Sequence, residues 1–380
     1  MNLRRILAVS SIFIFAAAAL VAPSLAAGKP DCTAIDGEYI VTFSKGAVIA
    51  NEVKNVNGRD VTPKYLYDEA LNGFAGFLTG DQVCNFKKRG NILDVELDQE
   101  VSIEATQSGA TWGLDRIDQV NLALDSSYSY TTSGALVDAY VIDTGILGTH
   151  TEFTGRMKSG YSAISDGRGT TDCNGHGTHV AGTTGGTIYG VAKAVSLVPV
   201  RVLDCNGSGS NSGVIAGINW AISNHASDVK AVANMSLGGG ASSAMDTAVN
   251  NLINDGVIVV VAAGNSRQDA CKSSPARVPA AITVAASEKS DVFASFSNRG
   301  KCVDIIAPGG DITSSWIGSN TATAAISGTS MASPHVAGAV ARALSVGRTA
   351  SAVLSDASAN KVTGVPRGTP NKLLYIAPSN

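Results

Sequence analysis

The chain has 380 residues, of which 16% are charged and 44% are hydrophobic, and its formal net charge is −3. This length is sufficient for one large domain and a small one, each with its own core. A nearly neutral chain with few charged residues lacks the basic surface that nucleic acids and anionic membranes bind. We therefore expect neither nucleic acid nor a membrane as a partner.

Residues 1–27 have the pattern of a secretory signal peptide. Arg4 and Arg5 precede an apolar run at 6–21, and small residues at 24–27 fit a cleavage site. A membrane anchor is the alternative, but Pro23 and the small residues disfavour it. We expect a secreted, extracellular protein. Its six cysteines are an even number that favours disulfide pairing, although counting leaves the connectivity open.

Residues 28–104 form a segment with its own pattern. Short apolar stretches at 39–43, 73–77 and 92–97 predict strands, and a helix is expected around 81–89. We expect a small α+β domain here. Cys32 and Cys84 lie in this segment and could pair with each other.

From residue 135 onward, short apolar runs alternate with helical patterns. Strands are expected at 136–142, 196–203, 232–237, 257–263, 282–285 and 303–307, and helices at 177–187, 212–224, 242–255 and 329–346. Strands that are apolar throughout, and that are separated by helices, indicate a mostly parallel sheet covered on both faces. Right-handed crossovers make such a sheet doubly wound, and its ligands bind at the carboxyl ends of the strands.

Ser330 is the strongest candidate for a nucleophile. It lies in a small-residue stretch that continues into apolar residues at helical spacing, which predicts a helix N-terminus. Unpaired backbone N–H groups there favour an oxyanion, although a helix cap is the commoner role for such a serine. Two other residues change this interpretation. His176, between two glycines, can activate the serine, and Asp143, at the end of a predicted strand, can orient the histidine.

Residues 141–145, 174–182 and 328–338 together resemble the three catalytic motifs of the subtilisin-like serine proteases, peptidase family S8, in the order Asp, His, Ser. The finer pattern resembles the proteinase K branch, especially its calcium-dependent, disulfide-bonded, aqualysin-like bacterial members. The resemblance covers roughly residues 105–380. It implies a secreted serine endopeptidase with a subtilisin-like fold, a catalytic triad of Asp143, His176 and Ser330, protein and peptide substrates, and a monomeric state.

The same resemblance implies that residues 28–104 are an inhibitory propeptide, so that the chain is a self-processing zymogen and its propeptide is an inhibitor of the mature enzyme. The expected cleavage site is Glu104–Ala105, since the residues after it resemble mature N-termini of this branch. Glu104 fits poorly in an apolar S1 pocket, so the pocket is tolerant or cleavage falls a residue or two away. An accessory domain retained in the mature enzyme is the alternative.

The family pattern also implies how substrate is held. The matching asparagine, Asn265, donates to the oxyanion through its side-chain amide, together with the backbone N–H of Ser330. The implied substrate-binding residues are Ser236, Leu237, Gly238 and Gly239 on one edge, Gly207, Ser208 and Gly209 on the other, and Ala262, Ala263 and Gly264 in the S1 wall. No acidic residue is evident there, so we expect a broad specificity with apolar or aromatic P1 side chains.

Calcium and two disulfides follow from the resemblance as well. The implied disulfides are Cys173–Cys205 and Cys271–Cys302. One calcium site is expected from Asp115, Asp118, Gln119 and Asp125, although Ser127 stands where relatives often have asparagine, and a second from Asp304 with the carbonyls of Pro279 and Ala281. Solvated surface carboxylates are the alternative for the first group.

Three other interpretations of these residues are possible. A zinc cluster of Cys173, His176 and His179, with Asp172 alongside, has permissible spacing, but it lacks a fourth ligand motif and leaves Ser330 unexplained. An esterase of the α/β-hydrolase type requires a different motif and residue order. A catalytically silent binding protein with a protease fold is the remaining alternative, and the intact triad argues against it.

Overall fold

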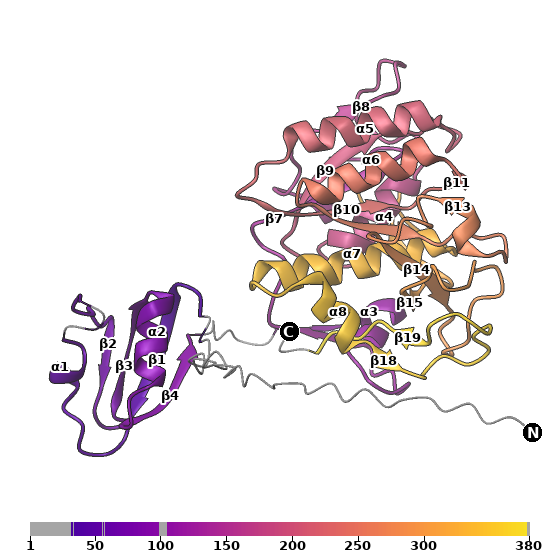
Figure 1. Ribbon diagram of the computed structural model, residues 1–380. Coiled ribbons are helices and arrows are strands. Elements are labelled where there is room, and N and C mark those ends of the chain that lie inside the picture. The colour runs from indigo at the N-terminus through magenta and orange to yellow at the C-terminus, as the bar shows by residue number, and fades with distance from the viewer. Residues whose placement is uncertain (1–31, 33, 55, 57, 99–104, 378–380) are drawn as a thin grey trace, which may run out of the picture. The chain divides into compact units, whose positions relative to one another are not determined.

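The computed structural model describes residues 32, 34–54, 56, 58–98 and 105–377 (Figure 1). The chain divides into two compact units, one up to Glu100 and one from Val101. The predicted signal peptide, residues 1–27, and the expected cleavage bond Glu104–Ala105 lie outside the described residues or at their edge. Among the described helices, none is long and apolar enough to cross a membrane.

The first unit is a four-stranded antiparallel sheet packed against a helix. The strands lie in the order β2-β3-β1-β4, with bounds β1 Gly37–Phe43, β2 Tyr65–Tyr67, β3 Gly73–Leu78 and β4 Ile92–Leu97, and the helices are α1 Ile49–Glu52 and α2 Gly80–Lys87. The three longer strands and α2 were predicted. Phe43, Phe74 and Phe86 pack together at the centre of a small core, and the Cys32–Cys84 disulfide closes a 52-residue stretch of chain around it.

A nine-stranded sheet is the centre of the second unit. Its order is β18-β19-β15-β14-β12-β10-β7-β9-β8, where the central strands are β7 Val137–Asp143, β9 Ser196–Arg201, β10 Lys230–Met235, β12 Ile258–Ala262, β14 Ile282–Ser287 and β15 Ile305–Pro308. Neighbouring strands pair in parallel from β8 (Tyr161–Ser162) to β19 (Lys372–Leu373), and only β18 (Ser358–Ala359) is antiparallel. The predicted mostly parallel sheet is confirmed.

Helices cover both faces of this sheet. Along β7, Val137, Ala139 and Val141 pack with the helices α4 (His176–Gly185) and α7 (Thr329–Ser345). Tyr140 and Ile142 point to the opposite face and pack with α5 (Asn211–Asn224) and α6 (Ser243–Asn254), which run side by side in Figure 1. Because both faces of the central strands are buried, most of their residues are apolar on both sides, which is the pattern that predicted a doubly wound sheet.

Several short elements were not predicted. They include α3 Trp112–Ile117, α8 Ala350–Asp356, the 3-10 turns Thr151–Phe153 and Ala270–Lys272, and the two-stranded pairs β5 Ala105–Ser108 with β6 Ser127–Tyr130, β11 Gly239–Gly240 with β13 Ser273–Ser274, and β16 Ile312–Ser315 with β17 Thr323–Ile326. Each is shorter than the window over which a hydrophobic pattern is read, about 11–18 residues, so tertiary contacts rather than local sequence decide its conformation.

Candidate active site

Ser330 is the second residue of α7, which begins after Gly328. Pro334 lies four residues further along the helix, and because proline has no N–H, the carbonyl of Ser330 has no partner within the helix. The hydroxyl of Ser236 takes that place and donates to the Ser330 carbonyl at 2.8 Å. The start of α7 is therefore fixed against the segment that follows β10.

The Ser330 hydroxyl donates a hydrogen bond to the carbonyl of Ser236, at 3.2 Å. Within the described part of the chain, no hydrogen bond joins this hydroxyl to His176. Hydrogen bonds between catalytic groups are often long or absent without substrate, so this geometry leaves the nucleophilic role open.

His176 and Asp143 are in direct contact. Asp143 is the last residue of β7 and is fully buried, His176 is the first residue of α4, and 2.8 Å separates His176 Nδ1 from Asp143 Oδ1. Burial acts to lower the pKa of His176, but the charge of Asp143 and its hydrogen bond outweigh burial, so the pKa is raised from its ordinary value. An imidazolium at this position is thus stabilised.

Gly175 makes the sharp entry into α4 possible. Its φ of 108° lies in the left-handed region, and a Cβ at this position would lie 2.5 Å from the ring of Trp316. Only glycine satisfies both conditions. The glycine before His176 therefore has a structural explanation.

Two nitrogen atoms that can donate hydrogen bonds, Asn265 Nδ2 and the backbone N of Ser330, lie near Gly328. The side-chain oxygen of Asn265 accepts from the backbone N–H and the hydroxyl of Thr329, both at 2.9 Å, so its amide Nδ2 points the other way. The position that a Cβ on Gly328 would take is 3.5 Å from both Asn265 Nδ2 and the backbone N of Ser330. A negatively charged oxygen in this region could accept from both donors.

A groove of about 500 Å³ opens beside His176. It brings together the two predicted substrate segments, since residues 206–209 and 236–239 both line it. Leu203, Val214 and Met245 supply apolar surface. Ala262, Ala263 and Gly264, which follow from β12, do not line this groove, and their predicted place in the S1 wall stays a prediction.

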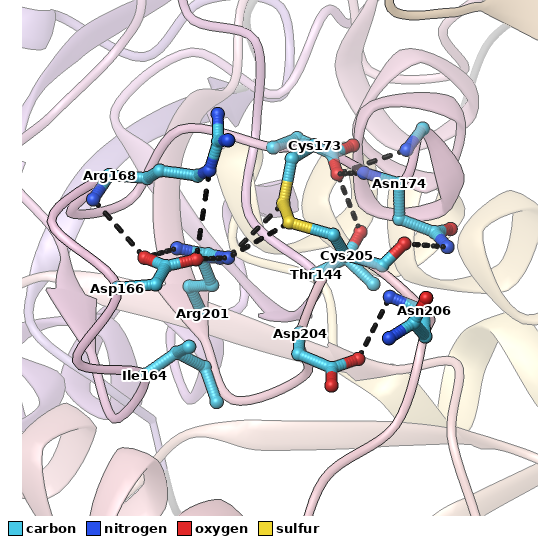
Figure 2. The surroundings of a disulfide bond; sticks show 12 residues. Thr144, Ile164, Asp166, Arg168, Cys173, Asn174, Arg201, Asp204, Cys205 and Asn206 are labelled. Atoms are coloured by element: carbon cyan, nitrogen blue, oxygen red, sulfur yellow. Dashed lines mark hydrogen bonds and ion pairs between the residues drawn. A yellow bond between two sulfur atoms is a disulfide. The ribbon is translucent and has the colours of Figure 1, made fainter.

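The Cys173–Cys205 disulfide joins the loop before α4 to the loop after β9, and Figure 2 shows the side chains around it. The buried guanidinium of Arg201 lies between Asp166 and the disulfide, with Nη2 3.2 Å from Cys173 Sγ and both nitrogens of its fork on the Asp166 carboxylate. Hydrogen bonding to Arg201 holds the pKa of Asp166 well below its usual range. The structure also contains the Cys271–Cys302 disulfide, so both pairs are those that the resemblance implied.

The zinc alternative fails on these contacts. Cys173 is in a disulfide, His176 pairs with Asp143, and the buried His179 faces the carbonyl of Ile312 at 2.8 Å through Nε2. Within the described residues, one trio of candidate metal ligands lies within 4.8 Å, Asp166 with Cys173 and Cys205. Its two sulfurs are bonded to each other and its carboxylate pairs with Arg201.

The predicted N-terminal calcium ligands lie near one another around α3. Asp115 accepts hydrogen bonds from Gln119, Asp125 and Ser126, and Ser127 donates to Asp125. Burial raises the pKa of Asp118 to about 6, with added repulsion from Asp115 and Asp125. Asp118 Oδ1 is buried without a hydrogen-bond partner. A divalent cation fits beside such a carboxylate oxygen, which has no hydrogen-bond partner and is close to two other carboxylates.

Asp304 lies just before β15 and beside the start of β14. Its carboxylate accepts from the backbone N–H of Thr283 at 2.8 Å, and burial raises its pKa. This places Asp304 next to the segment that contains Pro279 and Ala281. A half-buried carboxylate with a raised pKa is compatible with a cation, although this one already accepts from a backbone donor, so the second calcium site stays a prediction.

The sequence did not reveal which side chains hold the candidate catalytic residues in place. The Thr329 hydroxyl orients Asn265, and the hydroxyl of Thr144 accepts from the backbone N–H of Gly177 at 2.8 Å. The sequence contained one signal for such a contact. Pro334 lacks the N–H that would pair with the Ser330 carbonyl, which predicts that this carbonyl has a partner from outside the helix.

The chain as a whole is similar to known proteins. Residues 133–363 match the model of the subtilase family. The chain is 51% identical over 388 residues to an extracellular serine proteinase of Thermus sp. (strain Rt41A), which covers 95% of this chain and 94% of the relative. It is 45% identical to alkaline serine exoprotease A of Vibrio alginolyticus, over 91% of this chain and 68% of that protein. A crystal structure of a cold adapted subtilisin-like serine proteinase aligns with a TM-score of 0.68 at 53% identity, covering 70% of this chain and 98% of the other.

Proposed function

Because the chain belongs to the subtilase family and is an extracellular serine endopeptidase, we propose that it hydrolyses proteins through an acyl-enzyme on Ser330, with His176 as the base and Asp143 as the group that orients it. The observation that carries this proposal is the 2.8 Å contact between His176 Nδ1 and the buried Asp143. This contact turns Nε2, the other ring nitrogen, away from Asp143 and leaves it available to the serine.

The proposed reaction has two halves. Ser330 Oγ attacks the peptide carbonyl carbon while its proton passes to His176 Nε2, and the tetrahedral oxyanion accepts hydrogen bonds from Ser330 N and Asn265 Nδ2. The C–N bond then breaks as His176 gives the proton to the leaving amine. Water then gives a proton to His176 Nε2 and attacks the acyl carbon. The bond between this carbon and Ser330 Oγ breaks, the new carboxylic acid leaves, and the proton on His176 returns to Ser330 Oγ. The convergence of the two donors near Gly328 supports this arrangement.

For substrate binding, we propose that an extended peptide lies between residues 206–209 and 236–239 and pairs with their backbones. The exposed glycines of these segments permit close approach of a second backbone. The lining of the groove contains no acidic side chain and includes Leu203, Val214 and Met245. These features support broad specificity with apolar or aromatic side chains, including the proposed P1 preference.

We also propose that residues 28–104 are a propeptide that the enzyme removes near Glu104 and that then inhibits it. Supporting this, residues up to Glu100 form a compact unit with its own sheet, core and disulfide, so they can fold as a separate module. The mature enzyme is proposed to be a monomer of residues 105–380.

Calcium is proposed as a structural ion. Asp115, Asp118, Gln119 and Asp125 would hold one ion, and Asp304 with carbonyls of 279 and 281 a second. A bound ion supplies positive charge that relieves the repulsion among the carboxylates and links the segments they come from. The buried, unpartnered Asp118 Oδ1 supports the first site.

The proposed function is tested by incubating the purified secreted protein with casein, with and without a serine-directed phosphonylating reagent. Casein should be cleaved only by the untreated protein, and N-terminal mass spectrometry should place the mature terminus near Ala105. A catalytically silent binding protein, the remaining alternative, would leave casein intact in both samples.

A further inference from the structure

Asp172 lies four residues before His176, is 5% exposed, and has no role in the mechanism described above. Its carboxylate accepts five hydrogen bonds. Oδ1 accepts from the Thr144 hydroxyl (2.9 Å), Asn174 N (2.9 Å) and Gly175 N (3.0 Å), and Oδ2 from Thr178 N (2.9 Å) and the Thr178 hydroxyl (2.6 Å). A buried carboxylate with this many donors holds all of them in fixed positions.

These donors come from two different elements. Thr144 directly follows Asp143 at the end of β7, whereas Thr178 lies in the first turn of α4, two residues after His176. The Thr144 hydroxyl donates to Asp172 and accepts from the backbone N–H of Gly177 at 2.8 Å. Asp172 and Thr144 thus connect the strand of the catalytic aspartate to the helix of the catalytic histidine.

The helix needs this connection, because its N-cap is glycine. The first backbone N–H groups of a helix have no partner within it, and Gly175 has no side chain to accept from them. Three other side chains do so instead: Asn174 for His176 N, Thr144 for Gly177 N, and Asp172 for Thr178 N. The negative charge of Asp172 also complements the positive end of the helix dipole.

Packing at this junction is tight. A Cβ on Gly177 would lie 2.2 Å from the carbonyl oxygen of Gly145. Cys173 directly follows Asp172, so the Cys173–Cys205 disulfide restrains the same loop, and Figure 2 shows this disulfide with the side chain of Asn174. Small shifts here would therefore change the contact between His176 and Asp143.

We propose that Asp172 is a positioning residue of this protease, whose carboxylate sets His176 against Asp143 by holding the first turn of α4 to Thr144. This inference rests on the proposed roles of Asp143, His176 and Ser330. Asp172 touches no substrate in this account, so its loss should affect the chemical step rather than binding. The charged and titratable groups that act on His176 are Asp143, Asp172 and His179.

The test is Asp172→Asn in the full chain, assayed after secretion with a chromogenic peptide anilide. Asparagine has one acceptor oxygen, so its NH2 group must face either the three donors at Oδ1 or the two Thr178 donors at Oδ2. Helix α4 should therefore shift, and kcat should fall by about 10–100-fold with KM within about twofold. Removing the negative charge should also move the acid limb of the kcat/KM profile to lower pH, because Asp172 contributes to the raised pKa of His176.

The matched control is Asp269→Asn. Asp269 is an exposed aspartate that caps the turn beside the other disulfide by accepting from Cys271 N at 3.0 Å. Its variant should keep the wild-type kcat and acid limb. A merely structural role for Asp172 predicts a lower melting temperature with kcat and acid limb unchanged, and that result would overturn the proposal.

A second pair of variants protects the test if Asp172→Asn does not fold. Thr144→Ser keeps the hydroxyl and should keep activity, whereas Thr144→Val removes it at similar volume and should lose kcat. Equal kcat in both would overturn the proposal. Phosphonylation of the wild-type enzyme distinguishes failure of the proposed function from failure of the proposed role of Asp172. If no adduct forms on Ser330, the proposed function itself fails. If the adduct forms but Asp172→Asn is fully active, only the role of Asp172 is refuted.

Discussion

Asn265 offers a quantitative test of the proposed oxyanion site. Its Nδ2 and the backbone N of Ser330 both lie near Gly328, each 3.5 Å from the position that a Cβ would take there, and both are proposed as donors to the substrate oxyanion. Asn265→Ala removes one of them. Loss of a single such donor costs about 2.7–4 kcal/mol of transition-state stabilisation, so kcat should fall about 10²–10³-fold with little change in KM.

Asn265 also holds Thr329, and this effect must be separated from its donation to the oxyanion. Its Oδ1 accepts two hydrogen bonds from Thr329, and alanine removes these as well. Asn265→Asp retains an acceptor for Thr329 but replaces the donor Nδ2 with a charged oxygen that repels the oxyanion, so kcat should fall at least as far as in Asn265→Ala.

Both variants are measured by initial rates on a peptide anilide, per reactive serine titrated with a phosphonylating reagent. Circular dichroism of each variant checks that the fold is retained. If Asn265→Ala keeps kcat within about threefold of wild type, or if Asn265→Asp is as active as wild type, Asn265 does not stabilise the oxyanion.

Three further predictions concern processing, metal and pH. Ser330→Ala should accumulate as an uncut 28–380 species on denaturing gels, and normal maturation in a host without other proteases would contradict self-processing. Excess chelator should lower the melting temperature of the mature enzyme and hasten autolysis, since calcium at a hundredfold excess over Kd stabilises the native state by about 2.7 kcal/mol. Asp304→Ala should reproduce much of this loss of stability. Identical melting curves with and without calcium would exclude a structural calcium ion. Burial lowers the pKa of His179 and of His335 from 6.5 to about 4. Between these two pH values the unfolded state therefore binds more protons than the native state. The stability that is present above pH 6.5 should be lost as the pH falls toward 4. A shift of roughly 2.5 units at 1.36 kcal/mol each gives about 3 kcal/mol per histidine, measurable by denaturant unfolding of Ser330→Ala, and no acid loss in that window would be contrary to the account.

The sheet and its covering helices were predictable because burial on both faces makes strands apolar throughout. The run from Ile258 to Ala262 illustrates this, and Asp143, at the end of another such strand, lies where parallel sheets place their ligands. The antiparallel pairing of β5 with β6 was not predictable. Its strands, Ala105–Ser108 and Ser127–Tyr130, are joined by a segment that includes α3, and no local pattern in the sequence marks their pairing.

The motifs around the candidate site were recognisable, but the contacts that position its residues were not. Asp172 and Thr144 are 28 residues apart, and Ser236 and Ser330 are 94 apart, so the hydrogen bonds between them depend on the completed fold. Similarly, residues 206–209 follow β9 and residues 236–239 follow β10. They line one groove because β9 and β10 both lie next to β7 in the folded sheet, an order that the sequence does not reveal.

The central claim is that Ser330 carries the covalent intermediate. The most direct measurement treats the wild-type enzyme with a serine-directed phosphonylating reagent and maps the adduct by peptide mass spectrometry while caseinolytic activity is followed. The account predicts one adduct, on Ser330, that rises in proportion to the activity lost. An adduct on another residue that accompanies inactivation, or full activity after stoichiometric modification of Ser330, would contradict it.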